Sequence, residues 1–380
     1  MPKKPSTIFR LIHCSDIHFC VFPKNPFQCF NKRFKGLLRQ LIGGVSFRAL
    51  AISQRFPQLI EQLEADGVCV TGDVTITALD SEFRLAKEFL SRIETIAPVY
   101  IVPGNHDVYT YRSLKKQTFY SYFPNKELQT HRIAFQRLTS TWWLVLLDCS
   151  CFNGWYAANG EVTASQLRDL ERFLSSLPPS DHVIVANHYP LSPTTRPAHD
   201  LLNYAPLKSL LMHFPSVRLY LHGHDHHVEL DHLPPLVVNS GSLTLPSNAR
   251  FHIIDLHPEG GYQISTAAIT NLTETASPLK ISIEETTISL STLCTEVWNH
   301  EPGNLIMKEK KVLEISPEAA LLKKLRDRAI SHQEMQKRKF WVEKLITMPE
   351  STREPIETRK TLEPSQLFRK IAERLLKEGA

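Results

Sequence analysis

Short apolar runs of strand length recur through the first 260 residues and alternate with stretches of helical periodicity. The runs are rich in Val, Ile, Leu and aromatic residues and mostly lack polar alternation, as buried strands do. They cover residues 8–13, 68–70, 99–102, 142–147, 183–186 and 217–221. This alternation predicts an α/β domain, with two further edge strands at 236–239 and 251–256.

Two amphipathic helices are predicted between these strands, because apolar residues recur at helical spacing. The first apolar face consists of Phe83, Leu85, Ala86, Phe89, Leu90 and Ile93. The second consists of Leu167, Leu170, Phe173, Leu174 and Leu177. Thr163 precedes the second face and is a suitable N-cap residue.

The pattern changes beyond residue 272, which divides the chain into a first domain at 1–272 and a C-terminal extension at 273–380. We predict that the extension is mostly helical and charged. Its segments are a strand or irregular stretch at 281–290, a charged helix at 317–346, a polar linker at 348–363 and a last amphipathic helix at 367–376. Such helices could pack on the domain, pair with another chain or touch a membrane surface.

Composition narrows the class of protein. The chain has 380 residues, of which 42% are hydrophobic and 22% charged, as in globular proteins. No apolar run approaches the roughly 18 residues that a membrane span needs, and no signal-peptide core precedes Asp16 and His18. The seven cysteines contain no CxxC pair and fit free thiols in a reducing compartment. We therefore expect a cytoplasmic protein.

The net charge of +5 is unevenly distributed. Residues 304–380 carry a net charge of +6 and residues 1–303 a net charge of −1, so the main domain lacks the basic surplus of a nucleic-acid-binding protein. Residues 19–54 nevertheless contain basic and aromatic side chains and no acidic ones. This insert either binds anionic lipid head groups or an amphiphilic substrate, or folds over the domain with its charges in water.

Polar residues with metal-binding capacity follow five of the predicted strands. They are Asp16 and His18, then Asp73 after Gly72, then Asn105, His106 and Asp107, then His188, and finally His224 and His226. Ligands bind outside the carboxyl ends of strands in open α/β sheets, so these side chains are expected at one site. Carboxylates and imidazoles suit first-row cations such as Mn, Fe or Zn, and two cations about 3.5 to 4 Å apart can bind a phosphate ester and generate hydroxide.

The motifs DxH, GD, GNHD, H and GHxH occur intact and in this order, and the chain thereby resembles the calcineurin-like metallophosphoesterase superfamily over residues 8–256. The resemblance implies a four-layer αββα sandwich that holds two divalent ions, for which we expect Mn²⁺. It implies that Asp73 bridges the ions and that His106 is the general acid, with Asp107 fixing the tautomer of His106. The implied ligands are Asp16, His18, Asp73 and His226 for the first ion, and Asp73, Asn105, His188 and His224 for the second.

Several other residues lie near the motifs but are not part of them. His222 and His227 flank the last motif without a counterpart in the family pattern and are interpreted as bystanders. His13 and Cys14 are assigned to packing. His199 and Arg196, which follow His188, either contact a substrate phosphate or are simply solvated.

The expected activity is hydrolysis of a phosphodiester or pyrophosphate by a hydroxide that bridges the metals. Two branches of the family compete for the substrate. The basic, apolar insert favours a nucleotide lipid such as UDP-2,3-diacylglucosamine, which is used in lipid A synthesis and would be met at the inner face of the membrane. The alternative is a soluble cyclic nucleotide. A non-catalytic binding protein on the same fold would have lost a ligand or His106, and neither is lost.

Overall fold

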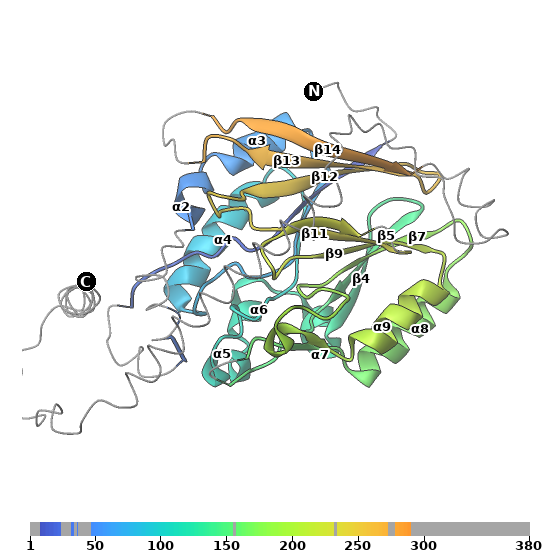
Figure 1. The fold of residues 1–380 in the computed structure, drawn as a ribbon, viewed down its shortest axis with the longest axis horizontal. Coiled ribbons are helices and arrows are strands. Elements are labelled where there is room, and N and C mark those ends of the chain that lie inside the picture. The colour runs from blue at the N-terminus through green and yellow to red at the C-terminus, as the bar shows by residue number, and fades with distance from the viewer. Residues whose placement is uncertain are drawn as a thin grey trace, which may run out of the picture. The chain divides into compact units, whose positions relative to one another are not determined.

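Two six-stranded sheets form the framework of the protein in the computed structural model (Figure 1). The model describes residues 8–23, 32–33, 36, 47–154, 157–231, 234–272 and 278–289, all of which belong to one compact unit. The first sheet has the order β14 (Ile281–Ser289), β13 (Tyr262–Ile269), β12 (Arg250–Leu256), β1 (Phe9–Cys14), β2 (Gly67–Val70) and β3 (Val99–Ile101). The second has the order β10 (Val228–Asp231), β11 (Leu236–Ser240), β9 (Val217–His222), β7 (His182–Ala186), β5 (Trp142–Leu147) and β4 (Ile133–Arg137).

Parallel strands at the centre of each sheet bring their carboxyl ends to one edge. In the first sheet β1, β2 and β3 are parallel neighbours, with Cys14 opposite Val70 and Val70 opposite Ile101. In the second sheet β5, β7 and β9 are parallel neighbours. Antiparallel strands complete both sheets, because β12 pairs with β1 and β10 pairs with β11. The loops that leave the parallel strands are therefore held together.

Three hydrophobic clusters separate four layers of secondary structure. Side chains such as Leu11 of β1 and Leu144 of β5 meet between the two sheets. The other face of the first sheet packs on α2, α3 and α4 through residues such as Phe89. The outer face of the second sheet packs on α8 and α9 through Leu170 and Leu211. The predicted αββα sandwich is confirmed, and Figure 1 shows the two groups of helices on opposite sides of the sheets.

The helices begin where the sequence offers caps and apolar periodicity. In α8, Thr163 accepts a hydrogen bond from the Gln166 backbone N–H, as predicted for this cap. In α4, the Glu82 carboxylate accepts hydrogen bonds from the backbone N–H groups of Thr77 and Leu79. The helices are α2 (Ala49–Ile52), α3 (Phe56–Gln62), α4 (Asp80–Glu94), α5 (Tyr111–Lys115), α6 (Thr118–Tyr122), α7 (Lys126–His131), α8 (Ala164–Ser176) and α9 (Tyr204–His213), with a 3₁₀ turn at Pro197–His199 and a short strand pair formed by β6 (Gly160–Glu161) and β8 (Leu201–Leu202).

Two sequence expectations about the sheets require correction or extension. The runs at 236–239 and 251–256 are strands, but they are not at the edges, because β10 and β13 pair on their outer sides. These partners escaped detection because Gln263, Ser265 and the exposed Glu229 and Asp231 interrupt their apolar character. β14 extends the first sheet past residue 272.

The helices predicted beyond residue 317 lie outside the described residues. The division of the chain into a domain and a C-terminal extension at residue 272 stays a prediction.

No helix in the described part of the chain is both long and apolar enough to cross a membrane.

Candidate metal centre

All seven predicted metal ligands lie at the edge where the parallel strands end. Asp16 and His18 follow β1, and Asp73 follows β2. Asn105 follows β3, His188 follows β7, and His224 and His226 follow β9. The side chains form two adjoining groups, which both contact Asp73.

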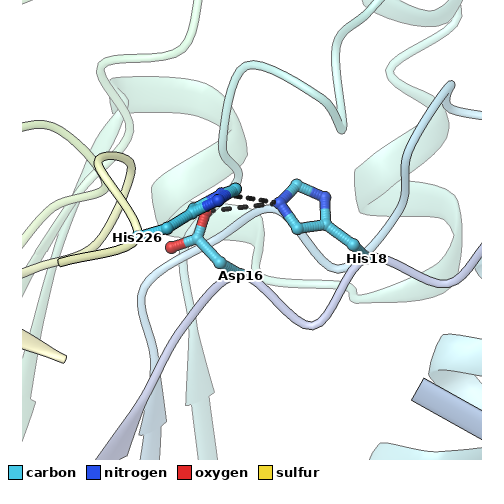
Figure 2. A group of neighbouring side chains, drawn as sticks. All are labelled: Asp16, His18 and His226. Atoms are coloured by element: carbon cyan, nitrogen blue, oxygen red, sulfur yellow. Dashed lines mark hydrogen bonds and ion pairs between the residues drawn. The ribbon is translucent and has the colours of Figure 1, made fainter. Parts of the chain in front are cut away.

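The first group consists of Asp16, His18 and His226, whose ligand atoms converge on one point (Figure 2). The Nε2 atoms of His18 and His226 are 3.1 Å apart. Asp16 Oδ1 lies 3.4 Å from His18 Nε2 and 3.1 Å from His226 Nε2. Three potential ligand atoms from two distant segments of the chain therefore face each other.

The second group consists of Asp73, Asn105, His188 and His224. His188 Nε2 lies 3.1 Å from Asn105 Oδ1, 3.1 Å from His224 Nδ1 and 3.4 Å from Asp73 Oδ2. Asp73 Oδ2 is also 3.9 Å from His18 Nε2 of the first group. Asp73 Oδ1 accepts a hydrogen bond from the backbone N–H of His106. Asp73 Oδ2 is therefore the oxygen that faces both groups.

Strained backbone conformations hold many of these side chains. Asp16, His18, Asp73, His224 and His226 all have positive φ angles, between 54° and 76°. Non-glycine residues rarely adopt this region, and each such residue costs about 1–3 kcal/mol that the surrounding structure must offset. Backbone hydrogen bonds fix the conformation, since Asp16 N donates to Gly72 O and His18 N donates to Asp73 O. The concentration of strain at one place is typical of a functional site.

Two motif glycines allow the β2 and β3 loops to touch. Gly72 has a φ angle of 90°, and a Cβ atom there would overlap the backbone of Gly104. A Cβ atom at Gly104 would in turn overlap the carboxylate and backbone of Asp73. The GD and GNHD motifs thus need glycine because the two loops approach each other closely.

Each of three imidazoles has its second ring nitrogen bound to a backbone carbonyl. His18 Nδ1 donates to Thr75 O, His188 Nδ1 donates to Thr71 O, and His224 Nε2 donates to His199 O. When such a ring is neutral, its other nitrogen, which faces the neighbouring ligand residues, carries a lone pair. Metal-ligating histidines adopt this arrangement.

The donor set fits a bound cation. His224 Nδ1 and Asn105 Oδ1 each lie 3.1 Å from His188 Nε2, and all three are atoms that can ligate a cation. Asp16 Oδ1 is buried and, among the described residues, accepts no hydrogen bond of good geometry. Buried carboxylate oxygens without a donor are costly unless a cation compensates them. A divalent ion in each group would satisfy these atoms, and imidazole with carboxylate is a donor set for first-row metals.

The electrostatics of the cluster keep its carboxylates ionised. Burial would raise the pKa of Asp16, but the charge of His226 holds it well below its usual range. Burial likewise opposes ionisation of Asp73, yet His188 and His106 lower the pKa of that carboxyl. The pKa of His188 is raised to about 9, because Asp73 outweighs the effect of burial.

His106 lies beside the two groups in the orientation that a proton donor requires. Its Nδ1 donates to Ile76 O at 2.6 Å, so Nε2 is the nitrogen that can exchange a proton with a ligand. His106 also lines the cleft described below. Burial lowers the pKa of His106 to about 4, and the nearby His18 contributes in the same direction.

The expected contact between Asp107 and His106 is wrong. The Asp107 carboxylate accepts hydrogen bonds from the backbone N–H groups of Thr75 and Gly104 and from the Thr75 hydroxyl, at 2.9 to 3.0 Å. The carbonyl of Ile76 fixes the His106 tautomer instead. Asp107 thus ties the loop after β2 to the loop after β3, a role hidden from the sequence because its partners are backbone atoms.

Three residues near the centre were not identified as site residues from the sequence. Tyr109 stacks on His106 with ring centroids 5.2 Å apart, and Lys32 Nζ lies 4.8 Å from the centre of the Tyr109 ring. Phe47 packs against His18 at 4.3 Å and against His226 at 5.5 Å. The insert at 19–54 therefore reaches the candidate centre. Of the three residues, only Tyr109 lies close enough to the GNHD motif in the sequence to have been a candidate site residue.

Lys32 and Arg33, two basic residues of the insert at 19–54, contact the domain itself. Lys32 Nζ donates to Ala157 O at 3.0 Å. Arg33 donates to Thr77 O and Ala78 O at 2.9 and 2.8 Å. Phe30, Phe34, Lys35 and Arg39, further basic and aromatic residues of the insert, lie outside the described residues.

A cleft of about 520 Å³ opens beside the centre. Asp73, Asn105, His106, His224 and His226 line its inner end. Its remaining wall is mostly polar and includes Thr194, Thr195, Arg196, His199, His222, His227, Glu229, Asp231 and Asn239. His222 and His227, interpreted as bystanders, therefore line the cleft together with Arg196 and His199. His13 and Cys14 are buried, as expected for packing residues.

Comparisons with known proteins agree with this geometry. Residues 9–228 match the family model of calcineurin-like phosphoesterases. The 3′,5′-cyclic adenosine monophosphate phosphodiesterase CpdA of Escherichia coli K12 is 30% identical over 173 residues, which cover 45% of this chain and 57% of that protein. CpdA of Haemophilus influenzae is 25% identical over 178 residues, which cover 45% of this chain and 60% of that protein. The chain thus spans less than two thirds of the length of these relatives.

A solved structure, a dimetal phosphatase from Danio rerio, covers 68% of this chain and 95% of its own, with a TM-score of 0.50 and 13% identity. At that identity the likeness concerns the fold alone. The family model covers more than half of the chain, including all five motifs. The resemblance inferred from these motifs is therefore confirmed, and the chain belongs to the calcineurin-like phosphoesterase family.

Proposed function

We propose that the protein is a metal-dependent phosphodiesterase with two divalent ions in its active site. The observation that carries this proposal is the convergence of potential ligand atoms from several loops on two adjoining points, with the buried Asp16 Oδ1 left without a hydrogen bond of good geometry. These atoms adjoin a cleft that is large enough for a small organic phosphate.

Each group of ligands would hold one ion. Asp16, His18 and His226 with Asp73 form the first set, and Asn105, His188 and His224 with Asp73 form the second. Two such ions supply Lewis-acid activation of the phosphate and of water. Asp73 would contribute to both sets, because its Oδ2 faces His18 of the first and His188 of the second. Mn²⁺ is our expectation for both ions, with Fe or Zn as the alternatives that the same ligands accommodate.

His106 acts as the proton donor to the leaving group in this proposal. Its ring is fixed from both sides, by the Nδ1 hydrogen bond to Ile76 O and by the stacked Tyr109. Nε2 faces the leaving oxygen, and it has to take up a proton before it can give one, a state that the charge of Asp73 favours against the effect of burial on the pKa of the ring. General acid catalysis of this kind contributes about 10²- to 10⁴-fold in rate.

The lining of the cleft favours a small polar diester, such as a 3′,5′-cyclic nucleotide. Val237, Pro190 and Pro193 are the apolar residues among the described lining, and polar side chains form the rest. Acyl chains gain their binding energy from apolar walls, which this cleft does not provide. The similarity to proteins named cyclic AMP phosphodiesterases points the same way.

A nucleotide lipid such as UDP-2,3-diacylglucosamine, bound at an anionic membrane surface, is the second candidate. The basic and aromatic composition of residues 19–54 favours it. The carbonyl contacts of Lys32 and Arg33 weaken it, because both side chains are engaged by the domain.

The proposal is tested with metal-free protein reconstituted with Mn²⁺. Hydrolysis of bis(p-nitrophenyl) phosphate, cyclic AMP and UDP-2,3-diacylglucosamine is measured side by side, with Asp73→Asn as the inactive comparison and Glu171→Gln on the outer surface of α8 as the matched control. We expect metal-dependent hydrolysis of the first two substrates. Hydrolysis of the lipid alone would favour the second candidate, and no metal-dependent hydrolysis of any diester would refute the proposed function.

A further inference from the structure

The cleft extends beyond the metal centre over a row of three side chains on the second sheet. Glu229 of β10 is paired with Asn239 of β11, and Asn239 is paired with His222 of β9. Directly opposed residues project from the same face of a sheet, and adjacent strands are about 4.8 Å apart, so the row is roughly 10 Å long. All three residues line the cleft. Because His222 is followed by Gly223 and His224, the row begins beside the metal centre and runs toward the sheet edge.

Two members of the row are buried and have an unused polar atom. Asn239 is 2% exposed, and its Oδ1 accepts a hydrogen bond from Gly241 N, which fixes the amide and leaves Nδ2 as a donor. His222 is 4% exposed, and its Nδ1 donates to Gly223 O, which leaves Nε2 as an acceptor. In the described ranges neither Nδ2 nor Nε2 has a hydrogen-bond partner. Both residues line the cleft, so these two atoms are available to a ligand there.

The charge of the lining limits what this ligand can be. Asp225, Glu229 and Asp231 contribute carboxylates to the cleft, whereas Arg196 is the one lysine or arginine among the described lining residues. A ligand group placed over the row meets one donor, Asn239 Nδ2, and acceptors on both sides of it. A second phosphate in this part of the cleft would meet like charges and would be disfavoured.

We propose that this row is a subsite for the organic group of a singly charged phosphodiester, and that Glu229 and Asp231 exclude substrates that carry a further phosphate. The inference rests on the proposed function, because it assumes that the reacting phosphate lies at the metal ligands. Asn239 Nδ2 donates to a ring nitrogen or carbonyl of the organic group. Glu229 and His222 Nε2 accept from its amino or hydroxyl groups. The sugar and base of a nucleotide offer both kinds of atom.

The test compares the binding of adenosine 5′-monophosphate with that of adenosine 3′,5′-bisphosphate, which differ by one phosphate. Dissociation constants are measured by calorimetry on the full-length, Mn²⁺-loaded protein and on Glu229→Gln and Asp231→Asn. Glu171→Gln removes an acidic side chain from the exposed surface of α8, outside the cleft, and is the matched control. Each cleft variant should improve bisphosphate binding relative to monophosphate binding by about three- to tenfold at low salt, and by less at high salt. A ratio unchanged from that of Glu171→Gln would overturn the exclusion.

Asn239→Asp tests the donor. The new side chain keeps an acceptor for Gly241 N and replaces Nδ2 with an anionic oxygen. Monophosphate binding should weaken about tenfold or more, because a donor to the ligand is exchanged for an anionic oxygen. Unchanged binding in a folded variant, checked by its melting temperature, would refute the subsite. Absence of diester hydrolysis by the wild-type protein would refute the proposed function instead, and the binding ratios would still decide the subsite.

Discussion

Asp107→Asn should destabilise the protein and impair every substrate alike, because Asp107 connects two loops rather than orienting His106. Its Oδ1 accepts from Thr75 N and the Thr75 hydroxyl at 3.0 and 2.9 Å. Its Oδ2 accepts from Gly104 N at 3.0 Å and from Val74 N at 3.4 Å. Asparagine retains one of the two oxygens and turns an NH₂ group toward the other pair of donors.

The magnitude follows from the donors that lose their acceptor. If the amide oxygen stays with Thr75, the N–H of Gly104 loses a full hydrogen bond and that of Val74 a long one. A buried donor without an acceptor costs about 1–3 kcal/mol, so the free energy of unfolding should fall by about 2–4 kcal/mol. For a domain of this size that corresponds to a melting temperature lower by roughly 5–12 °C. The loops carry Asp73 and Asn105, so metal affinity should fall as well.

The assay compares diesters with good and poor leaving groups in Asp107→Asn, with the melting temperature measured on the same samples. We expect similar proportional losses for a nitrophenolate and for an alkoxide leaving group. The result that would refute the reasoning is an unchanged melting temperature with a loss confined to the poor leaving group, since that pattern belongs to a residue that acts through the proton donor.

Three further changes should separate the roles of neighbouring residues. His106→Asn should retain both metal ions and lose about 10²- to 10⁴-fold in rate for a poor leaving group, with a smaller loss for a nitrophenolate; equal losses in steady-state assays would contradict its role as the acid. Tyr109→Leu removes the ring stacked on His106 and should show the same dependence on the leaving group, at about tenfold; loss of metal on elemental analysis would instead indicate a structural role. Burial raises the pKa of Glu82 to about 7 from 4.5, so its contribution to stability is full below pH 4.5 and is lost as the pH rises through about 7. Between pH 5 and 8 the free energy of unfolding of the wild-type protein, measured with urea, should therefore fall by about 2.5 kcal/mol more than that of Glu82→Gln. Parallel pH profiles of the two proteins would contradict this assignment.

The sequence predicted the parts of the fold that depend on local pattern. Unalternating apolar runs such as Trp142–Leu147 are strands because both faces of the sheets are covered, and the Thr163 cap begins α8 as expected. The polar-alternating strands β10 and β13 carry a weaker signal, so their partners β11 and β12 were wrongly placed at the edges.

The sequence likewise predicted some features of the candidate site and not others. Motif order identified the residues that converge, because strand ends in parallel sheets share an edge. Every residue type has a backbone carbonyl and nearly every one a backbone N–H, so the sequence does not reveal which backbone atom a side chain will contact. The carbonyl partners of His106 and His224 and the loop contacts of Asp107 were therefore not predictable. The approach of Phe47 and Lys32 to the centre depends on how a long insert folds back, and residue spacing does not encode that.

Titration of metal-free protein with Mn²⁺, followed by electron paramagnetic resonance, tests the central claim most directly because it needs no substrate. Wild-type protein should bind two ions per chain and show the signal of a magnetically coupled pair. Asp73→Asn, which alters the atom that faces both ligand groups, should bind one ion or fewer and lose the coupling. Two coupled ions in Asp73→Asn at wild-type affinity, or fewer than two in the wild-type protein at saturation, would contradict the account.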